Sequence, residues 1–246
     1  MQKRIVCILQ PNYLPYIGYY DLIYKCDDFV IYDDVQYTKN DWRNRNQIKT
    51  PQGSMWLTVP VLADNRMTEY RLIKDIQINN DIDWSTKHMK SLLMNYTRAP
   101  YFREVYELLG EELEKKWHNI TDLNNVLNSK IVNYLGFSKR FYSSHALGVG
   151  RGSGRSERIV EICKALEATH YLSGDAAKAY LNEKLFNDEG MRVVWHNYTH
   201  PVYKQLWGEF KPYMSIVDVL FNHGKSAFNI IKEGSCDKEE AVQGNQ

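Results

Sequence analysis

Two short apolar runs near the N-terminus, residues 4–9 and 29–32, have the length and continuity of strands that are buried on both faces. Between them, residues 15–25 carry apolar side chains at helical spacing, and Pro15 suits the first turn of a helix. A strand, a helix and a second strand in this order form a βαβ unit, which needs a parallel sheet.

The rest of the chain continues the alternation of strand-like and helix-like segments. The pattern predicts further strands at residues 56–62, 72–78, 171–174 and 192–195, and helices within 84–135 and at 155–167, 175–185 and 215–222. Thr121 and Asp122 are expected to cap a helix that runs through Leu135 and ends at Gly136. We therefore expect a single α/β domain over residues 1–234, a Rossmann-like parallel sheet with flanking helices. Within it we expect residues 84–135 to form a mostly helical insertion or lid, and we expect residues 235–246 to be a polar tail.

Composition narrows the class of protein. Hydrophobic residues make up 43% of the 246 residues, which is enough for a core, and 31 basic residues nearly balance 30 acidic ones. A net charge of +1 provides no basic face for nucleic acid. No run is long enough for a membrane span or a signal peptide, and the four cysteines form no C-x-x-C pair. We expect a cytoplasmic protein without structural disulfides. The sequence is compatible with a homo-oligomer.

Aromatic residues are unusually frequent, with 18 Tyr and 6 Trp. Tyr and Trp combine an apolar ring with a polar group, so they suit sites that stack and hydrogen-bond sugar or base rings. Many of them are equally expected to line the core.

The first candidate site is the turn after the first strand. It offers Gln10, Asn12, Tyr13, Tyr16 and Tyr19, between two prolines that fix the backbone. Ligands of open α/β sheets bind outside the carboxyl ends of strands, where a helix N-terminus presents free N–H groups. The alternative is a purely structural turn.

The second candidate follows the neighbouring strand, so it is expected to meet the first at one crevice. Asp33 or Asp34 could act as a general base. The accompanying polar side chains are suited to binding a phosphate or carboxylate together with hydroxyl groups, and they are Gln36, Arg43, Asn44, Arg45 and Lys49. The alternative is a solvated loop with local ion pairs.

Two later segments are weaker candidates. The glycine-rich residues 148–154 precede a helix, and Arg151 and Arg155 could close over a phosphate, although a flexible surface loop fits as well. His196 and His200 could act in acid–base chemistry. The two histidines are four residues apart, a spacing that suits a zinc site only on a helix, and Pro201 disfavours a helix here. We therefore expect no metal site and identify no cofactor.

The opening residues resemble a known family. ILQPNYLPYIGY at residues 8–19, DDVQY at 33–37 and NRNQIK at 44–49 resemble the opening of the WbqC-like family, and APYF, YLSG, HPVY and MSIVD fit it further along the chain. The resemblance covers residues 4–234 and implies genomic association with enzymes of lipopolysaccharide O-antigen and capsule synthesis. It implies no assigned reaction.

A weaker likeness concerns Tyr16 and Tyr19, which occupy the place of the H-x-G-H histidines of Rossmann-like nucleotidyltransferases and pantothenate synthetase. A Tyr hydroxyl supplies no cation near neutral pH, so adenylation by the same means is not expected.

These features together predict a sugar-modifying group transferase or amide-forming ligase for surface polysaccharide. Its small-molecule ligand is expected to be a nucleotide sugar or another phosphate or carboxylate compound. The alternative is a non-catalytic protein of the same pathway that binds the sugar nucleotide or assists assembly.

Overall fold

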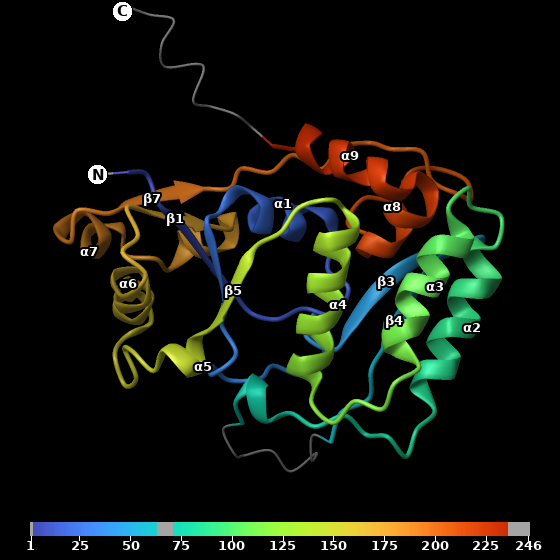
Figure 1. Ribbon diagram of the computed structural model, residues 1–246, viewed down its shortest axis with the longest axis horizontal. Helices are drawn as coiled ribbons and strands as arrows, with labels where there is room; N and C mark the ends of the chain where they lie inside the picture. The colour runs from blue at the N-terminus through green and yellow to red at the C-terminus, as the bar shows by residue number, and fades with distance from the viewer. Residues whose placement is uncertain (1, 63–70, 236–246) are drawn as a thin grey trace, which may run out of the picture.

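A five-stranded parallel sheet organises the computed structural model, which describes residues 2–62 and 71–235 (Figure 1). Its strands are β1 (Ile5–Leu9), β2 (Asp28–Ile31), β5 (Arg140–Ser143), β6 (His170–Ser173) and β7 (Arg192–Trp195), in the spatial order β5-β2-β1-β6-β7. The chain starts in the middle of the sheet, adds strands on one side, and then crosses to the other side. This is the α/β, Rossmann-like arrangement that the sequence predicts.

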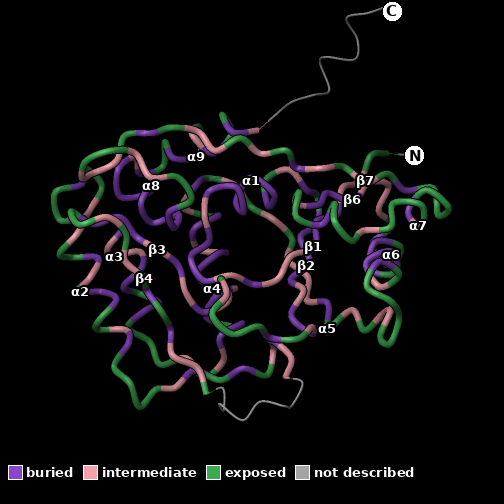
Figure 2. The backbone as a smooth tube through the Cα atoms, turned by 180° about the vertical axis from the view of Figure 1, so that it is seen from behind, coloured by how far each residue is buried: buried purple, intermediate pink, exposed green. Residues whose placement is uncertain are grey.

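Helices cover both faces of the sheet because successive side chains of each strand point to opposite faces. Val6, Ile8 and Val30 pack in one hydrophobic cluster with residues of α6 (Arg155–Ala165) and α7 (Glu183–Asp188). Cys7 and Phe29 join the other cluster, which contains residues of α1 (Ile17–Lys25), α4 (Ile120–Tyr134), α8 (Ile216–His223) and α9 (Ala227–Glu233). In Figure 2, α1 and the central strands are accordingly largely buried.

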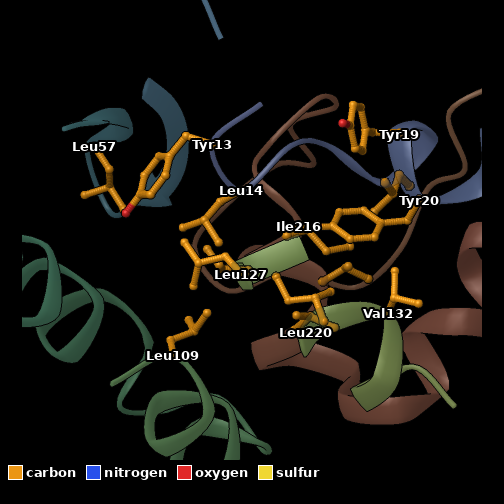
Figure 3. Packing of buried hydrophobic residues seen from close by; sticks show 14 of the residues in the cluster. Tyr13, Leu14, Tyr19, Tyr20, Leu57, Leu109, Leu127, Val132, Ile216 and Leu220 are labelled. Carbon is orange, nitrogen blue, oxygen red and sulfur yellow. The ribbon is translucent and has the colours of Figure 1, made fainter. Parts of the chain in front are cut away.

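A hairpin and three helices separate β2 from β5 in the sequence. The hairpin consists of β3 (Arg45–Thr50) and β4 (Gly53–Thr58), and the helices are α2 (Trp84–Tyr96), α3 (Phe102–Leu113) and α4. Leu57 of the hairpin, Leu109 of α3 and Leu127 of α4 belong to the same hydrophobic cluster as Tyr13 and Leu14 (Figure 3). The shorter elements are η1 (Ile73–Asp75), α5 (Ser144–Leu147), η2 (Asp175–Ala179) and η3 (Gly224–Ser226).

Several predicted elements are confirmed. The βαβ unit at the N-terminus has its ends within two residues of the predicted ones, and residues 192–195 form β7. Residues 84–135 are mostly helical, and Gly136 follows α4 with a φ of 89°. The helix α4 is capped by Asn119, whose side chain accepts from Thr121 N–H, and not by Thr121 or Asp122 themselves.

Two other predictions are wrong, and one strand was not predicted. Residues 72–78 form no continuous strand, because their backbone bonds go to separate partners; Ile73 N–H donates to Val35 O and Ile78 N–H to His118 O. Residues 175–185 form no single helix, because Asn182 interrupts them and caps α7. Residues 45–50 form the strand β3, which the sequence pattern did not predict.

Across the described part of the chain, none of the helices has the length and apolar character needed to cross a membrane.

Candidate functional site

The strand order reverses between β1 and β6, so a crevice is expected between these two strands at the carboxyl edge of the sheet. Gln10 directly follows β1, and Gly174 directly follows β6. Ligands of open α/β sheets bind at such a reversal point. The sequence identified the β1 end of this crevice, but it could not identify the β6 end because the strand order was not known.

Side chains from distant parts of the chain fix the turn that follows β1. The Asn46 amide donates to the carbonyls of Tyr13 and Leu14 at 3.2 and 2.8 Å, and Ser215 Oγ also donates to Leu14 O at 2.8 Å. From α4, Asn128 Nδ2 donates to Asn12 O at 3.1 Å. These bonds hold Leu14 at a φ of 42°, an unusual conformation for a branched residue.

A pocket of about 240 Å³ lies against this turn, and we call it the aromatic pocket. It is lined by Asn12, Pro15, Tyr16, Trp42, Asn46 and Tyr213. The sequence identified Asn12 and Tyr16 as ligand-binding candidates but missed Trp42 and Tyr213. A larger hollow of about 610 Å³ lies at the opposite edge, between Arg4 and Arg140. We place the site at the aromatic pocket because parallel sheets bind ligands at the carboxyl edge.

Close contacts fix two walls of the aromatic pocket. A Cβ built on Gly18 would come within 2.5 Å of Tyr16 Cε2, so only glycine lets the Tyr16 ring lie there. The Tyr16 ring stacks with the His200 ring, with 6.5 Å between centroids, and makes an edge contact with the Tyr213 ring, with 5.9 Å between centroids. Burial raises the pKa of Tyr16 to about 12, so its hydroxyl stays protonated near neutral pH.

His200 holds the other wall. Its Nε2 accepts from the Tyr213 N–H at 3.1 Å, and its Nδ1 lies 2.9 Å from Pro201 O, to which a protonated Nδ1 donates. Burial lowers the pKa of His200, which favours this neutral form. Both ring nitrogens are therefore occupied, and the contacts give His200 a role in positioning Tyr213.

Several buried polar side-chain atoms have no hydrogen-bond partner within the described residues. They are Gln10 Oε1, Asn12 Oδ1, Arg43 Nε, Arg45 Nε, Asn124 Oδ1 and Arg158 Nε. Folded proteins leave few buried polar groups unpaired, so these atoms indicate a missing partner such as a ligand or water. The amide oxygens need N–H or O–H donors, whereas the arginine Nε atoms need acceptors such as phosphate oxygens.

Arg43 is a largely enclosed cation. Its side chain is 15% exposed and pairs with Asp41 at 2.7 Å. Burial lowers the pKa of Arg43, because its charge is partly removed from water. A bound anion would compensate this cost.

Asp33 and Asp34 are held at the end of β2. Asp33 accepts from the hydroxyls of Ser143 and Ser144 and from His145 N–H, at 3.0–3.3 Å. Asp34 pairs with Arg158 at 2.5 Å. Burial acts to raise the pKa of Asp34, but the bonds from Ser144 and Arg158 outweigh it and lower that pKa below its ordinary value. Asp34 is thus kept ionised and is a weak base.

Several predicted ligand-binding residues have partners inside the protein. Tyr13 and Tyr19 lie in the core (Figure 3), where their hydroxyls bond His88 Nδ1 at 2.9 Å and Gln10 O at 3.1 Å. Asn44 bonds Tyr37 and Val59, and Lys49 Nζ donates to Glu209 O at 2.6 Å. These placements favour structural roles for the four side chains.

The remaining candidates lie on the surface or in separate contacts. Gln36, Arg151 and Arg155 are exposed; the Arg151 guanidinium donates to His145 O, and Arg155 lies over the Tyr180 ring. His196 is buried with its Nε2 at 2.7 Å from Asp21 Oδ2. Within residues 2–62 and 71–235, no group of three or more His, Cys, Asp or Glu could hold a metal ion.

Comparison with known proteins supports a family relationship. A family model described as the WbqC-like protein family matches residues 10–230. The chain is also 43% identical over 224 residues to "Uncharacterized protein Rv1507c" of Mycobacterium tuberculosis (strain ATCC 25618 / H37Rv), a match that covers 90% of this chain and 95% of the relative. No solved structure matches the chain.

Proposed function

Because the chain belongs to the WbqC-like family, we propose that it modifies a sugar for surface polysaccharide as a group transferase or amide-forming ligase. The expected substrate is a nucleotide-linked or amino sugar. The family resemblance supports the polysaccharide context, and the crevice at the carboxyl edge of the sheet supports binding of a small molecule.

The unpaired polar atoms carry the proposal. Gln10 and Asn12 offer buried oxygens that need donors, such as sugar hydroxyls or amines. Arg43 and Arg45 offer buried Nε–H groups that need an acceptor, and a phosphate fits them. A phosphorylated sugar supplies both kinds of partner in one molecule.

Asp33 is the group that we assign as general base. Its partners are hydroxyls and a backbone N–H, whereas the charge of Asp34 is paired with Arg158. In the proposed step, the sugar amine or hydroxyl attacks the carbonyl carbon of an activated acyl or aminoacyl donor. The new bond forms as the bond to the leaving group breaks, Asp33 takes the proton, and the leaving group departs with the electron pair.

A non-catalytic binding or assembly protein is the second candidate. The observation that favours it is that Asp34, His196 and His200 are all occupied by partners within the protein. Acid–base groups that are tied up in this way suit a carrier better than an enzyme.

A binding panel tests the proposed function. Nucleotide sugars, ATP and amino acids are added separately to the full chain, and a ligand that binds the native state raises the melting temperature. Arg43→Gln is expected to weaken that shift, whereas Arg103→Gln, an exposed residue of α3, leaves it unchanged. If no compound of any class shifts the melting temperature, a small-molecule function is excluded.

Turnover with the bound sugar and acyl or aminoacyl donors then separates enzyme from carrier. Asp33→Asn is expected to lower turnover roughly 100-fold or more while binding stays within a few-fold of the parent chain. Binding without turnover for every donor would support the carrier, and unchanged turnover in Asp33→Asn would exclude Asp33 as the base.

A further inference from the structure

The aromatic pocket offers flat apolar surfaces and few free polar groups. Tyr16, Trp42, Tyr213 and Pro15 supply rings, and Asn12 and Asn46 supply the side-chain amides. The Asn46 side chain is already used, because its amide donates to Tyr13 O and Leu14 O and its oxygen accepts from Gln47 N–H at 2.8 Å. Asn12 Oδ1 is the buried polar side-chain atom of the pocket that lacks a partner within the described residues.

A sugar ring fits this chemistry poorly. It carries hydroxyls on most of its carbons, and each hydroxyl that is buried without a partner costs free energy. A nucleobase has two apolar faces and a few polar atoms on its edge, so it needs stacking surfaces and a small number of hydrogen bonds. A pocket of about 240 Å³ is also small for a complete ligand and suits a single ring system.

We infer that the aromatic pocket binds the nucleobase of the nucleotide-linked substrate, with Trp42 as its stacking surface and Asn12 as the contact to its edge. This inference rests on the proposed function and divides its ligand into parts. The base enters the aromatic pocket, the phosphates face Arg43 and Arg45, and the sugar lies toward Gln10 and the crevice.

Trp42 is held ready for such stacking. The backbone N–H of Trp42 donates to Asp41 Oδ1 at 2.7 Å, and its backbone carbonyl accepts from Tyr13 N–H at 2.9 Å. Its ring makes a tilted contact with the Trp56 ring, with 5.5 Å between centroids, and Arg45 Cζ lies 4.3 Å from the Trp56 ring centroid. Trp42 nevertheless remains 43% exposed, so stacking by a base would remove apolar surface from water without a large rearrangement.

The phosphate assignment follows from position. Arg43 is next to Trp42 in the chain, and Asn124 donates to both Arg43 O at 2.8 Å and Pro11 O at 3.3 Å. The backbone of Arg43 is therefore held beside the same turn that supplies Asn12. The unpaired oxygen of Asn12 requires an N–H on the edge of the base, as an imide or an amino group provides.

The test compares ligands that contain a base with ligands that do not. Uridine, thymidine, guanosine, adenosine and cytidine monophosphates are titrated against the full chain by calorimetry, beside glucose 1-phosphate and glucosamine 1-phosphate. Trp42→Ala is expected to weaken nucleotide binding roughly 5- to 100-fold, the range that loss of one base–aromatic stack produces. Trp42→Phe keeps a ring and is expected to lose less.

A matched control is Tyr180→Ala, which removes an aromatic ring that is 50% exposed but does not line the aromatic pocket. It is expected to leave nucleotide binding unchanged. Circular dichroism and thermal unfolding check that each variant is folded before its affinity is compared.

The outcomes separate the inference from the proposed function. Nucleotide binding that depends on Trp42, with weak binding of the sugar phosphates, supports the inference. The inference is overturned if sugar phosphates bind as tightly as nucleotides, or if Trp42→Ala leaves nucleotide affinity unchanged. Either outcome leaves the proposal of sugar binding intact. Failure of all phosphates and nucleotide sugars to bind removes the proposed function itself.

Discussion

At the scale of single residues, the ring of Tyr16 lies so close to Gly18 that the start of α1 has no room for a side chain there. Gly18→Ala is expected to displace the ring from the aromatic pocket and lower ligand affinity at least several-fold. Stability is expected to stay level or rise, since alanine favours a helix over glycine by up to about 1 kcal/mol. Calorimetric titration and urea unfolding of the same variant measure the two effects.

Tyr16→Ala and the double variant provide the comparison for this prediction. If Gly18→Ala acts through the ring, the double variant binds no more weakly than Tyr16→Ala alone. Additive losses would mean that Gly18 influences the ligand by another route.

His88 predicts how stability depends on pH. It is 5% exposed between the Tyr13 hydroxyl and Thr58 O, and burial lowers its pKa from 6.5 to about 4. In the unfolded chain it binds a proton below about pH 6.5, while the folded state does not until about pH 4. Its contribution is therefore complete above pH 6.5 and is lost as the pH falls toward 4, by roughly 3 kcal/mol in all.

Urea unfolding at pH 7.5, 6.5, 5.5 and 4.5 measures this loss. His88→Gln keeps an acceptor for Tyr13 and a donor for Thr58 but cannot titrate, so its stability should fall less steeply. His118→Gln alters an exposed histidine and should keep the parent slope. Equal slopes in the parent chain and His88→Gln would exclude His88 as the source.

The sequence predicts where the candidate site lies but not the direction of each side chain within it. Gln10, Asn12 and Arg43 were recognisable because amides and arginines follow two neighbouring strands. Tyr13 and Tyr16 were not distinguishable, since the same residue type fills a core position in one case and lines the aromatic pocket in the other. Tyr213 lines the aromatic pocket beside Tyr16 only because a segment distant in the sequence folds against it.

At the scale of elements, α4 supports the turn after β1 through two asparagines. Asn128 is 4% exposed; its amide donates to Asn12 O, and its oxygen accepts from Tyr20 Oη at 2.7 Å. Asn128→Ala leaves both groups buried without this partner, so the free energy of unfolding is expected to fall by about 1–3 kcal/mol. Asn133→Ala, on the exposed side of the same helix, should change it by less than about 0.5 kcal/mol.

The elements that the sequence predicted are those whose own apolar pattern is sufficient. β1 is a continuous apolar run, β2 is apolar after Asp28, and β7 is apolar after Arg192. β3 has the sequence RNQIKT with few apolar residues, and its strand form comes from pairing with β4. β5 is a four-residue edge strand that pairs with β2, and such short strands carry little signal of their own.

At the scale of the whole molecule, one hydrophobic cluster joins parts that the chain order keeps apart. It contains Phe29 of the sheet, Ile48 of the hairpin, Leu92 of α2 and Leu220 of α8. We predict that the chain unfolds in a single cooperative transition, because α1, α2, α3, α4, α8 and α9 all contribute buried residues to this shared core.

Far-UV circular dichroism and tryptophan fluorescence, followed against urea, should give coincident transitions. Tryptophans lie in the hairpin, α2 and β7, so the fluorescence reports several regions. Two separated midpoints would show instead that residues 84–135 unfold independently as an insertion.

The composition of the aromatic pocket also has a consequence for biosynthesis. Asn12, Trp42 and Asn46 are made early, whereas Tyr213 and the Ser215 that holds Leu14 come near the end of the chain. At typical rates of translation, roughly 10–30 s pass between the synthesis of Asn46 and that of Tyr213. The central strand β1 likewise lacks its partner strand β6 until β6 has been synthesised. A ligand therefore cannot meet the complete aromatic pocket until Tyr213 has been synthesised and folded into place.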